Sequence, residues 1–144
     1  MQLTRYTDYS LRVLIFLAIQ PPERRSTINE IADRFEISRN HLVKIVHRLG
    51  QLGYVRTIRG KGGGLCIGAE PDEINLGAVV RDTEATLDVI NCTDPYCPVA
   101  PACRLKGVLN EARDAFLAVL DRYTLADLIH NRAQLASLLR METR

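Results

Sequence analysis

The sequence predicts a mainly α fold with one small β-hairpin: a winged helix-turn-helix, then a cysteine-rich loop and a long C-terminal helix. Three features predict this fold. Two short amphipathic patterns with helix-capping residues follow one another closely, a glycine-rich hairpin pattern comes directly after them, and an apolar stripe at helical spacing runs through the last third of the chain. The length of 144 residues suits one domain with its own hydrophobic core.

A buried helix opens the chain. Apolar side chains recur near helical spacing from Leu3 to Ile19, and Pro21 and Pro22 end the pattern. Its longest apolar run, seven residues from Val13, is much shorter than the ~20 residues of a membrane-spanning helix. Charged residues beside the run, and no small-residue cleavage site after it, argue against a signal peptide. We therefore expect a cytoplasmic protein with no membrane partner.

Two short helices are predicted next. Thr27 begins a capping box with Glu30, which starts a short helix with an apolar inner face. After a tight connection, Ser38 can cap a second helix that runs from Arg39 to about Leu52. Two short helices joined in this way form a helix-turn-helix.

The exposed face of this second helix carries candidate DNA-binding residues. Its N-terminal end, the end of a recognition helix that enters the major groove, is rich in side chains that donate hydrogen bonds to bases or phosphates. The candidates on this helix are Ser38, Arg39, Asn40, His41, Lys44 and Arg48.

A hairpin follows the helix-turn-helix. Residues 53–59 alternate as in a strand, the glycines of residues 60–64 can form a turn with positive φ, and residues 65–67 return as a second strand. Arg59 and Lys61 lie at its tip, so we expect this wing to touch the DNA backbone or the minor groove. A short helix from Ile74 to about Thr83 should then complete a DNA-binding domain over residues 1–83.

Basic residues are concentrated in this part of the chain. Between positions 37 and 69 there are six Lys or Arg residues and no Asp or Glu. Subtracting these six from the 19 basic residues of the chain leaves 13, against all 17 acidic residues, so the segment carries +6 and the remainder −4. Such a segment is typical of a surface that binds phosphate groups, although alone it is also compatible with an ordinary solvated face.

The segment from Cys92 to Cys103 contains three of the four cysteines and three prolines. Because each proline fixes φ and lacks a backbone donor, we expect an irregular loop, within a region that spans residues 84–103. Cytoplasmic thiols are kept reduced, and grouped thiolates are soft ligands that select zinc or an iron–sulfur cluster. Cys92, Cys97 and Cys103 are therefore candidate ligands, whereas Cys66 stands alone in the wing.

The last long helix carries one apolar stripe. Pro101 suits its first turn, and apolar residues then keep to one face for about 20 residues, or ~30 Å of helix. A winged helix of this size does not need so long a stripe for its own core, so we expect a homodimer in which this helix packs against its copy. The stripe consists of Leu105, Val108, Leu109, Ala112, Phe116, Val119, Leu120 and Tyr123.

The C-terminal tail is less regular. Thr124 can cap a short final helix, and Leu135, Leu138 and Leu139 hint at one further turn or two. We assign residues 104–144 to a dimerisation helix and this tail.

Separate patches along nearly the whole chain are similar to the Rrf-two family of winged-helix transcriptional regulators. These patches are Met1-Gln2-Leu3-Thr4 with Tyr6-Thr7-Asp8-Tyr9, Ser38-Arg39-Asn40-His41 with Val43-Lys44-Ile45, Gly53-Tyr54-Val55, Arg59-Gly60-Lys61 with Gly63-Gly64, Val89-Ile90-Asn91-Cys92, Pro101-Ala102-Cys103-Arg104-Leu105-Lys106 and Tyr123-Thr124-Leu125-Ala126-Asp127-Leu128.

The resemblance implies a homodimeric repressor, not an enzyme, that binds a palindromic operator in double-stranded DNA. It further implies an iron–sulfur cluster on Cys92, Cys97 and Cys103, with 4Fe-4S favoured and 2Fe-2S as the alternative, and loss of DNA affinity when nitric oxide attacks the cluster. The family branch that senses cluster supply has a histidine three residues after the last cysteine, where this chain has Lys106. The family's other fourth ligand corresponds to Asp8 of the partner subunit, although Asp8 could instead cap its helix.

Two other interpretations stay open. A regulator of the same architecture could respond to cluster supply, to redox state or to zinc, but cysteine spacings of four and five residues differ from the Cys-x2-Cys pairs of structural zinc sites. An iron–sulfur redox protein is the second alternative. The chain lacks a flavin or nicotinamide motif, and that function would leave the basic helix and the wing unexplained.

Overall fold

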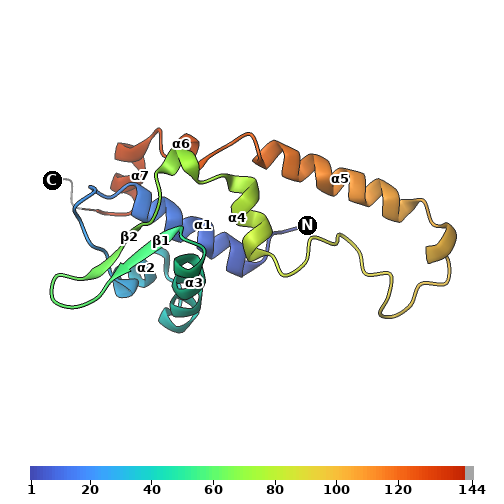
Figure 1. Ribbon diagram of the computed structural model, residues 1–144, viewed down its shortest axis with the longest axis horizontal. Coiled ribbons are helices and arrows are strands. Elements are labelled where there is room, and N and C mark those ends of the chain that lie inside the picture. Colours follow the sequence, from blue (N-terminus) through green and yellow to red (C-terminus); the bar gives the residue numbers. More distant parts are fainter. Residues whose placement is uncertain (142–144) are drawn as a thin grey trace.

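Helix α1 (Arg5–Ala18) lies at the centre of the fold in the computed structural model, which describes residues 1–141 (Figure 1). The other elements are α2 (Ile28–Phe35), α3 (Arg39–Gln51), β1 (Val55–Ile58), β2 (Gly64–Ile67), η1 (Pro71–Glu73), α4 (Leu76–Thr83), η2 (Ala100–Ala102), α5 (Leu105–Leu120), α6 (Leu125–Leu128) and α7 (Arg132–Leu138). We call residues 1–83 with 121–141 the head, and residues 84–120 the arm. The head is mainly helical with one two-stranded hairpin, which confirms the predicted fold class.

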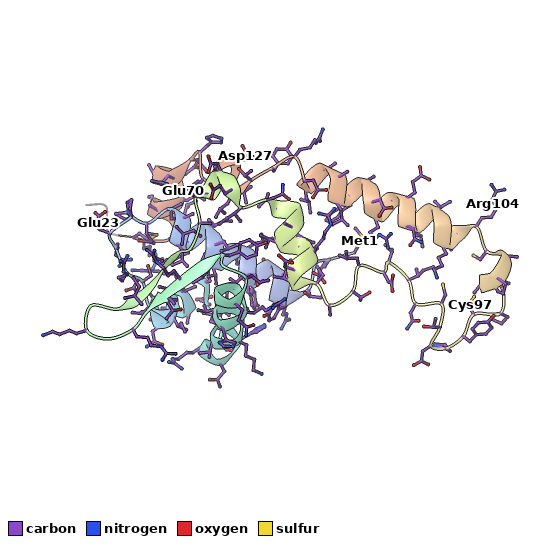
Figure 2. The ribbon with its side chains drawn as sticks, in the orientation of Figure 1. Met1, Glu23, Glu70, Cys97, Arg104 and Asp127 are labelled. Carbon is purple, nitrogen blue, oxygen red and sulfur yellow. The ribbon has the colours of Figure 1, made fainter. Side chains whose placement is uncertain are left out.

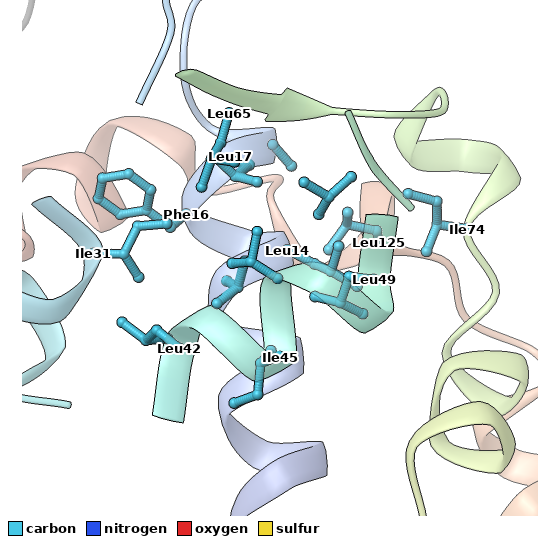
Figure 3. Close-up of a cluster of buried hydrophobic side chains, with 14 of the residues drawn as sticks. Leu14, Phe16, Leu17, Ile31, Leu42, Ile45, Leu49, Leu65, Ile74 and Leu125 are labelled. Atoms are coloured by element: carbon cyan, nitrogen blue, oxygen red, sulfur yellow. The ribbon is translucent and has the colours of Figure 1, made fainter. Parts of the chain in front are cut away.

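The core of the head is one apolar cluster built around α1 (Figure 3). Helices α3, α4 and α6 and strand β2 pack against α1, and α2 packs on α3. Leu14, Ile45 and Leu49 have no exposed surface. Full burial of a side chain of this size stabilises the fold by ~1.5–3 kcal/mol. The inward positions of α2 and α3 follow the predicted helical period.

Helix α1 starts at Arg5, two residues after the predicted start, because Thr4 caps it by accepting a hydrogen bond from the backbone N of Thr7. Two polar residues of α1 are also fully buried, which the apolar pattern did not indicate. The hydroxyl of Ser10 donates to the carbonyl of Tyr6 at 2.6 Å, and Thr7 accepts from the Thr83 hydroxyl at 2.9 Å. These bonds satisfy the buried hydroxyl groups.

The helix-turn-helix forms as predicted, with one difference at its first cap. Thr27 Oγ1 accepts from the backbone N of Glu30 at 3.1 Å. The Glu30 carboxylate accepts from Arg24 at 3.2 Å and, within residues 1–141, does not bind the backbone N of Thr27. Between α2 and α3, Glu36 takes the left-handed conformation with φ 55°. Ser38 Oγ then caps α3 by accepting from the backbone N of His41 at 3.2 Å.

Strands β1 and β2 form the wing, an antiparallel hairpin in which Val55 pairs with Ile67 and Ile58 with Gly64. The backbones of Ser26 and Leu65 exchange two hydrogen bonds of 2.9 and 2.7 Å, which fasten the wing to the segment before α2. Gly64 has φ 147°, and a Cβ there would lie 2.7 Å from the carbonyl oxygen of Ser26. Only glycine fits this close approach of two backbones.

Helix α4 begins at Leu76, because Asn75 caps it by accepting from the backbone N of Ala78 at 3.0 Å. The predicted start, Ile74, instead lies buried before the helix at 1% exposure. Four consecutive residues at the end of α4 each bind a different part of the chain. The pairs are Arg81 with Asp121, Asp82 with Tyr54, Thr83 with Thr7, and Glu84 with Thr4.

The arm leaves the head after α4, runs outward as an irregular loop, and returns as α5 (Figure 1). The prediction that Pro101 lies in the first turn of the long helix is wrong, since Pro101 belongs to η2 and α5 begins at Leu105. The helix has 16 residues and ends at Leu120, so Tyr123 lies beyond it.

Residues after the arm return to the head. Thr124 and Asp127 form a complete capping box at α6, in which the Thr124 backbone N donates to Asp127 Oδ2 at 2.7 Å. Leu125 is fully buried in the same core as α1. The further helical turns expected in the tail are present as α7. Its Leu135 packs against the core, whereas Leu138 is 73% exposed. No helix of residues 1–141 is long and apolar enough to cross a membrane.

Candidate DNA-binding surface and cluster-binding loop

The first turn of α3 presents the predicted recognition residues at the surface. Arg39 and Asn40 are exposed, and His41 is half-buried. Further along the helix, Lys44 and Arg48 are exposed on the face away from the buried Leu42, Ile45 and Leu49. The hydroxyl of Ser38 is engaged as the helix cap. The helix therefore offers several hydrogen-bond donors to a ligand without giving up its core contacts.

Two side chains that the sequence did not indicate hold these recognition residues. Asn29 of α2 accepts a hydrogen bond from Arg39 Nε at 3.0 Å. Tyr9 of α1 packs edge to face on the ring of His41, with 5.2 Å between the ring centroids. Tyr9 lies in one of the patches that resemble the family and Asn29 lies in the first helix of the helix-turn-helix, but these contacts appear only when the packing of α1, α2 and α3 is known.

The wing carries the other predicted DNA contacts. Arg59 and Lys61 are both exposed at its tip, where Gly60 and Gly62 have φ of 91° and 77°. The wing is braced at its root by the Tyr54 hydroxyl, which donates to Asp82 Oδ2 at 2.6 Å. Partial burial, together with this hydrogen bond and the charge of Asp82, raises the pKa of Tyr54. Tyr54 therefore stays protonated and remains a donor.

The cysteine loop lies at the outer end of the arm, where Figure 2 labels Cys97 and Arg104. Its backbone folds on itself: the N of Cys97 donates to the carbonyl of Cys92 at 3.1 Å, and the N of Ala100 to that of Cys97 at 3.1 Å. Asn91 Oδ1 accepts from the backbone N of both Thr93 and Asp94 at 3.0 Å. The loop is thus a folded turn structure and carries neither an α-helix nor a strand through its prolines, as predicted.

Cys92, Cys97 and Cys103 are free and half-buried on this loop. Among residues 1–141, no three His, Cys, Asp or Glu side chains lie close enough together to hold a metal ion. The assignment of these thiols as ligands therefore stays a prediction. Their chemistry fits an iron–sulfur cluster, because thiolates are the protein ligands of such clusters and one loop supplies three of the usual four. The missing fourth ligand would have to come from elsewhere.

Asp8 lies in the first turn of α1, in the head. Its carboxylate accepts two hydrogen bonds from Arg12, at 2.9 and 3.0 Å, and the Asp8 side chain is 42% exposed. The Arg12 guanidinium also lies over the ring of Tyr9, 5.5 Å from its centroid. Asp8 is therefore an accessible carboxylate that already has a cationic partner, and its role as a ligand also stays a prediction.

Helix α5 keeps most of the predicted apolar stripe exposed. Leu105 is 57% exposed, Val108 59% and Val119 46%. Leu117 is the buried residue of this helix. It lies about 120° around the helix from Leu105 at 3.6 residues per turn, so the contact of α5 with its own chain uses a flank outside the stripe.

A basic recognition helix on a helix-turn-helix, followed by a basic wing, defines the winged-helix class of DNA-binding proteins. The comparisons with known proteins agree with this class. Residues 3–131 match the family model of Rrf2, described as an iron-dependent transcriptional regulator. The chain belongs to the Rrf2 family, which consists of transcriptional regulators and not of enzymes.

Individual relatives extend this finding. The chain is 54% identical to the HTH-type transcriptional regulator NsrR of Bacillus subtilis (strain 168), over 99% of both chains. It is 52% identical to the NsrR of Geobacillus kaustophilus (strain HTA426), over 97% of both. Among solved structures, CymR, the global cysteine regulator of B. subtilis, matches with a TM-score of 0.70 at 30% identity and covers 89% of this chain and 95% of its own.

The structure of T. potens IscR matches with a TM-score of 0.74 at 24% identity, over 91% of this chain and 88% of that one. This last likeness concerns the fold. The head and arm together are therefore an architecture shared within the family.

Proposed function

We propose that this protein is a cytoplasmic, homodimeric transcriptional repressor that binds a palindromic operator and releases it when nitric oxide reacts with an iron–sulfur cluster. The cluster, 4Fe-4S in preference to 2Fe-2S, would be held by Cys92, Cys97, Cys103 and Asp8 of the partner subunit. The observation that carries the proposal is the presence, in one chain similar to NsrR, of a basic winged helix and three free thiols on one loop.

DNA binding would use the first turn of α3 in the major groove and the tip of the wing on the backbone. Arg39, Asn40 and His41 have the donor groups that recognise base edges, whereas Arg59 and Lys61 are placed for phosphates. A symmetric dimer presents two such surfaces, which fit two half-sites one helical turn, or about 34 Å, apart. This symmetry is why we expect a palindromic operator.

The exposed stripe of α5 supports the homodimer. A row of apolar side chains that the described residues leave largely exposed gains stability when it is buried, by ~25 cal/mol for each Å² removed from water. The second copy of α5 is the occupant that we propose, because a twofold interface is self-complementary and an apolar stripe matches its own copy.

Ligation by Asp8 of the partner subunit would link the arm of one protomer to the head of the other. Asp8 would exchange its ion pair with Arg12 for the cluster, and it lies next to Tyr9, which contacts His41 of α3. The helix that carries the ligand therefore also supports the recognition helix. Loss of the link would let the two recognition helices leave the spacing that the two half-sites require.

Anaerobic purification tests the proposal. We expect a coloured dimer with iron and sulfide in its absorbance and metal analysis, tight binding to an operator, and loss of binding after nitric oxide. A colourless zinc-loaded protein that binds DNA regardless of nitric oxide would contradict it. Cys97→Ala should abolish the colour, and Cys66→Ala, a matched change at a buried cysteine outside the loop, should keep it.

The Asp8 ligand is tested by a separate pair of variants. Asp8→Ala should weaken cluster retention or the response to nitric oxide while the protein stays dimeric. Arg12→Gln removes the competing ion pair and leaves the carboxylate free, so the cluster should be retained. Unchanged spectra and unchanged sensitivity in Asp8→Ala would remove Asp8 from the mechanism.

A further inference from the structure

Arg39 is fixed by a residue of another helix before any DNA is bound. Its Nε donates to Oδ1 of Asn29 at 3.0 Å, which joins the first residue of α3 to the first turn of α2. Both side chains are exposed, so the bond lies at the surface and not in the core. Its strength therefore adds little to folding, and its effect is on the direction of the Arg39 side chain.

The bond leaves the recognition end of Arg39 free. A guanidinium has five N–H donors, one on Nε and two on each Nη nitrogen. Asn29 uses the single donor on Nε, so both Nη nitrogens of Arg39 keep their hydrogens for a ligand. A pair of parallel donors at this end matches O6 and N7 of guanine in the major groove.

The other candidate residues of α3 are held differently. His41 makes an aromatic contact with Tyr9, and the side chains of Asn40, Lys44 and Arg48 make no hydrogen bond within the described residues. Arg39 is thus the donor of this helix that a polar acceptor orients in advance. Orienting a long side chain in advance reduces the entropy that binding must remove.

We propose that Asn29 is a positioning residue for sequence recognition: it presents the Nη pair of Arg39 end-on to a guanine in each half-site. This inference rests on the proposed DNA-binding function and extends it to a residue outside the recognition helix. It predicts that Asn29 affects the preference for one base pair without touching that base pair.

The test selects binding sites from a randomised double-stranded DNA library with the purified full-length dimer, and compares variants by sequencing. Arg39→Ala should lose the preference for a G·C pair at one position of each half-site. Asn29→Ala should weaken the preference at the same position by about three- to tenfold, as expected for one side chain that is no longer held. The affinity of Asn29→Ala for DNA should depend on salt in the same way as the affinity of the original protein, because the substitution removes no phosphate contact.

Two further variants serve as controls. Asn29→Asp keeps an acceptor for Arg39 and should retain the base preference, although its added negative charge should lower affinity for all sequences alike. Asn131→Ala makes the same substitution as Asn29→Ala at an exposed asparagine next to α7, and should leave the selected site unchanged. In the double variant of Asn29→Ala and Arg39→Ala, the loss should be no larger than that of Arg39→Ala alone.

The possible failures are distinguishable. If the original protein selects no motif, the proposed DNA-binding function fails. If it selects a motif that Arg39→Ala leaves intact, or if Asn29→Ala lowers affinity for all sequences equally, the DNA-binding function stands and the role of Asn29 is overturned. A base preference unchanged in Asn29→Ala would overturn it too.

Discussion

The head buries its apolar side chains and pairs its buried polar ones, whereas the arm leaves many of its apolar side chains and thiols without partners among the described residues. In the head, Leu14, Leu42 and Leu125 are fully buried, and the polar Thr7 and Ser10 are buried with hydrogen-bond partners. In the arm, the hydrogen bonds found for residues 91–103 of the cysteine loop stay within that loop, three thiols are free, and most of the apolar stripe of α5 is exposed.

This difference separates what the chain stabilises alone from what it leaves for other molecules. The head needs no further contact to bury its core. The arm has unused ligands at its end and an unused apolar face along its length, which are the two features that a cofactor and a second subunit would complete. Changes in the head should therefore affect folding, and changes in the arm should affect assembly and cofactor binding.

The largest effect is expected from the core of the head. Leu14→Ala should lower the free energy of unfolding by about 2–5 kcal/mol, because it leaves a cavity at a fully buried position of α1. Denaturant unfolding followed by circular dichroism measures this change. The matched truncation in the arm, Val99→Ala at a residue 61% exposed, should change it by less than about 0.5 kcal/mol. Equal losses in the two variants would break the distinction between head and arm.

A charge in the stripe of α5 should act on assembly instead. Val108→Asp should raise the dimer dissociation constant by about 100-fold or more, because the interface has twofold symmetry and would take up two unpaired charges. Analytical ultracentrifugation measures the constant, and the helical circular dichroism of the head should persist. Ala118→Asp places the same charge on the exposed side away from the stripe and should leave the dimer intact. A monomeric Ala118→Asp would show that another face of α5 forms the interface.

The tip of the wing belongs to the head but lies outside its core, so changes there should affect DNA binding and not folding. Arg59→Ala and Lys61→Ala should each lower the slope of log affinity against log salt by about 1, as expected for one lost phosphate contact. The unfolding free energy should stay the same, because both residues are exposed. A change in base preference without a change in salt slope would assign these residues to base recognition.

The smallest effect is expected where head and arm join, at the exposed ion pair of Arg81 and Asp121. Its hydrogen bond from Arg81 holds the pKa of Asp121 below the ordinary value. The resulting stabilisation is present above the unfolded pKa of about 4 and is lost as the pH falls through the lower folded pKa. Arg81→Gln should therefore reduce stability at neutral pH and have no effect once Asp121 is protonated. Thermal unfolding at several pH values tests this, and an equal loss at all pH values would rule out the ion pair as the cause.

The sequence predicted the head well because periodicity and capping chemistry act locally. Thr27, Ser38 and Thr124 each cap a helix at the predicted place, and the glycines of the wing mark its turn. The predicted starts of α5 and α4 were wrong, because at both places the residue types fit more than one local structure. Pro101 fits the first turn of a helix, but it equally fits the 3-10 turn that precedes α5. Helix α4 begins at Leu76 and not at Ile74, because Asn75 caps it and the cap lies before the first helical residue.

The site was predictable only in part. The donors on α3 and the thiols of the loop have chemistry that is evident from residue type, so both sets could be named in advance. The residue types of Asn29 and Tyr9 give no such signal, since their importance comes from side-chain contacts between different helices. The partner of Asp8 in this chain, Arg12, lies one helical turn away and was in principle predictable from its spacing.

The end of α4 couples the local unfolding of several segments that are distant in sequence. Residues 81–84, which form the end of α4 and its C-cap, bind Asp121 just after α5, Tyr54 at the root of the wing, Thr7 in α1 and the α1 cap Thr4. This segment cannot unfold without releasing all four contacts. Amide protons at the root of the wing and in the first turn of α1 should then exchange with solvent in one cooperative unit, although these segments are distant in sequence. A strain applied to the arm at residue 84 would be distributed over the whole of that unit, and would not be confined to the adjoining residues.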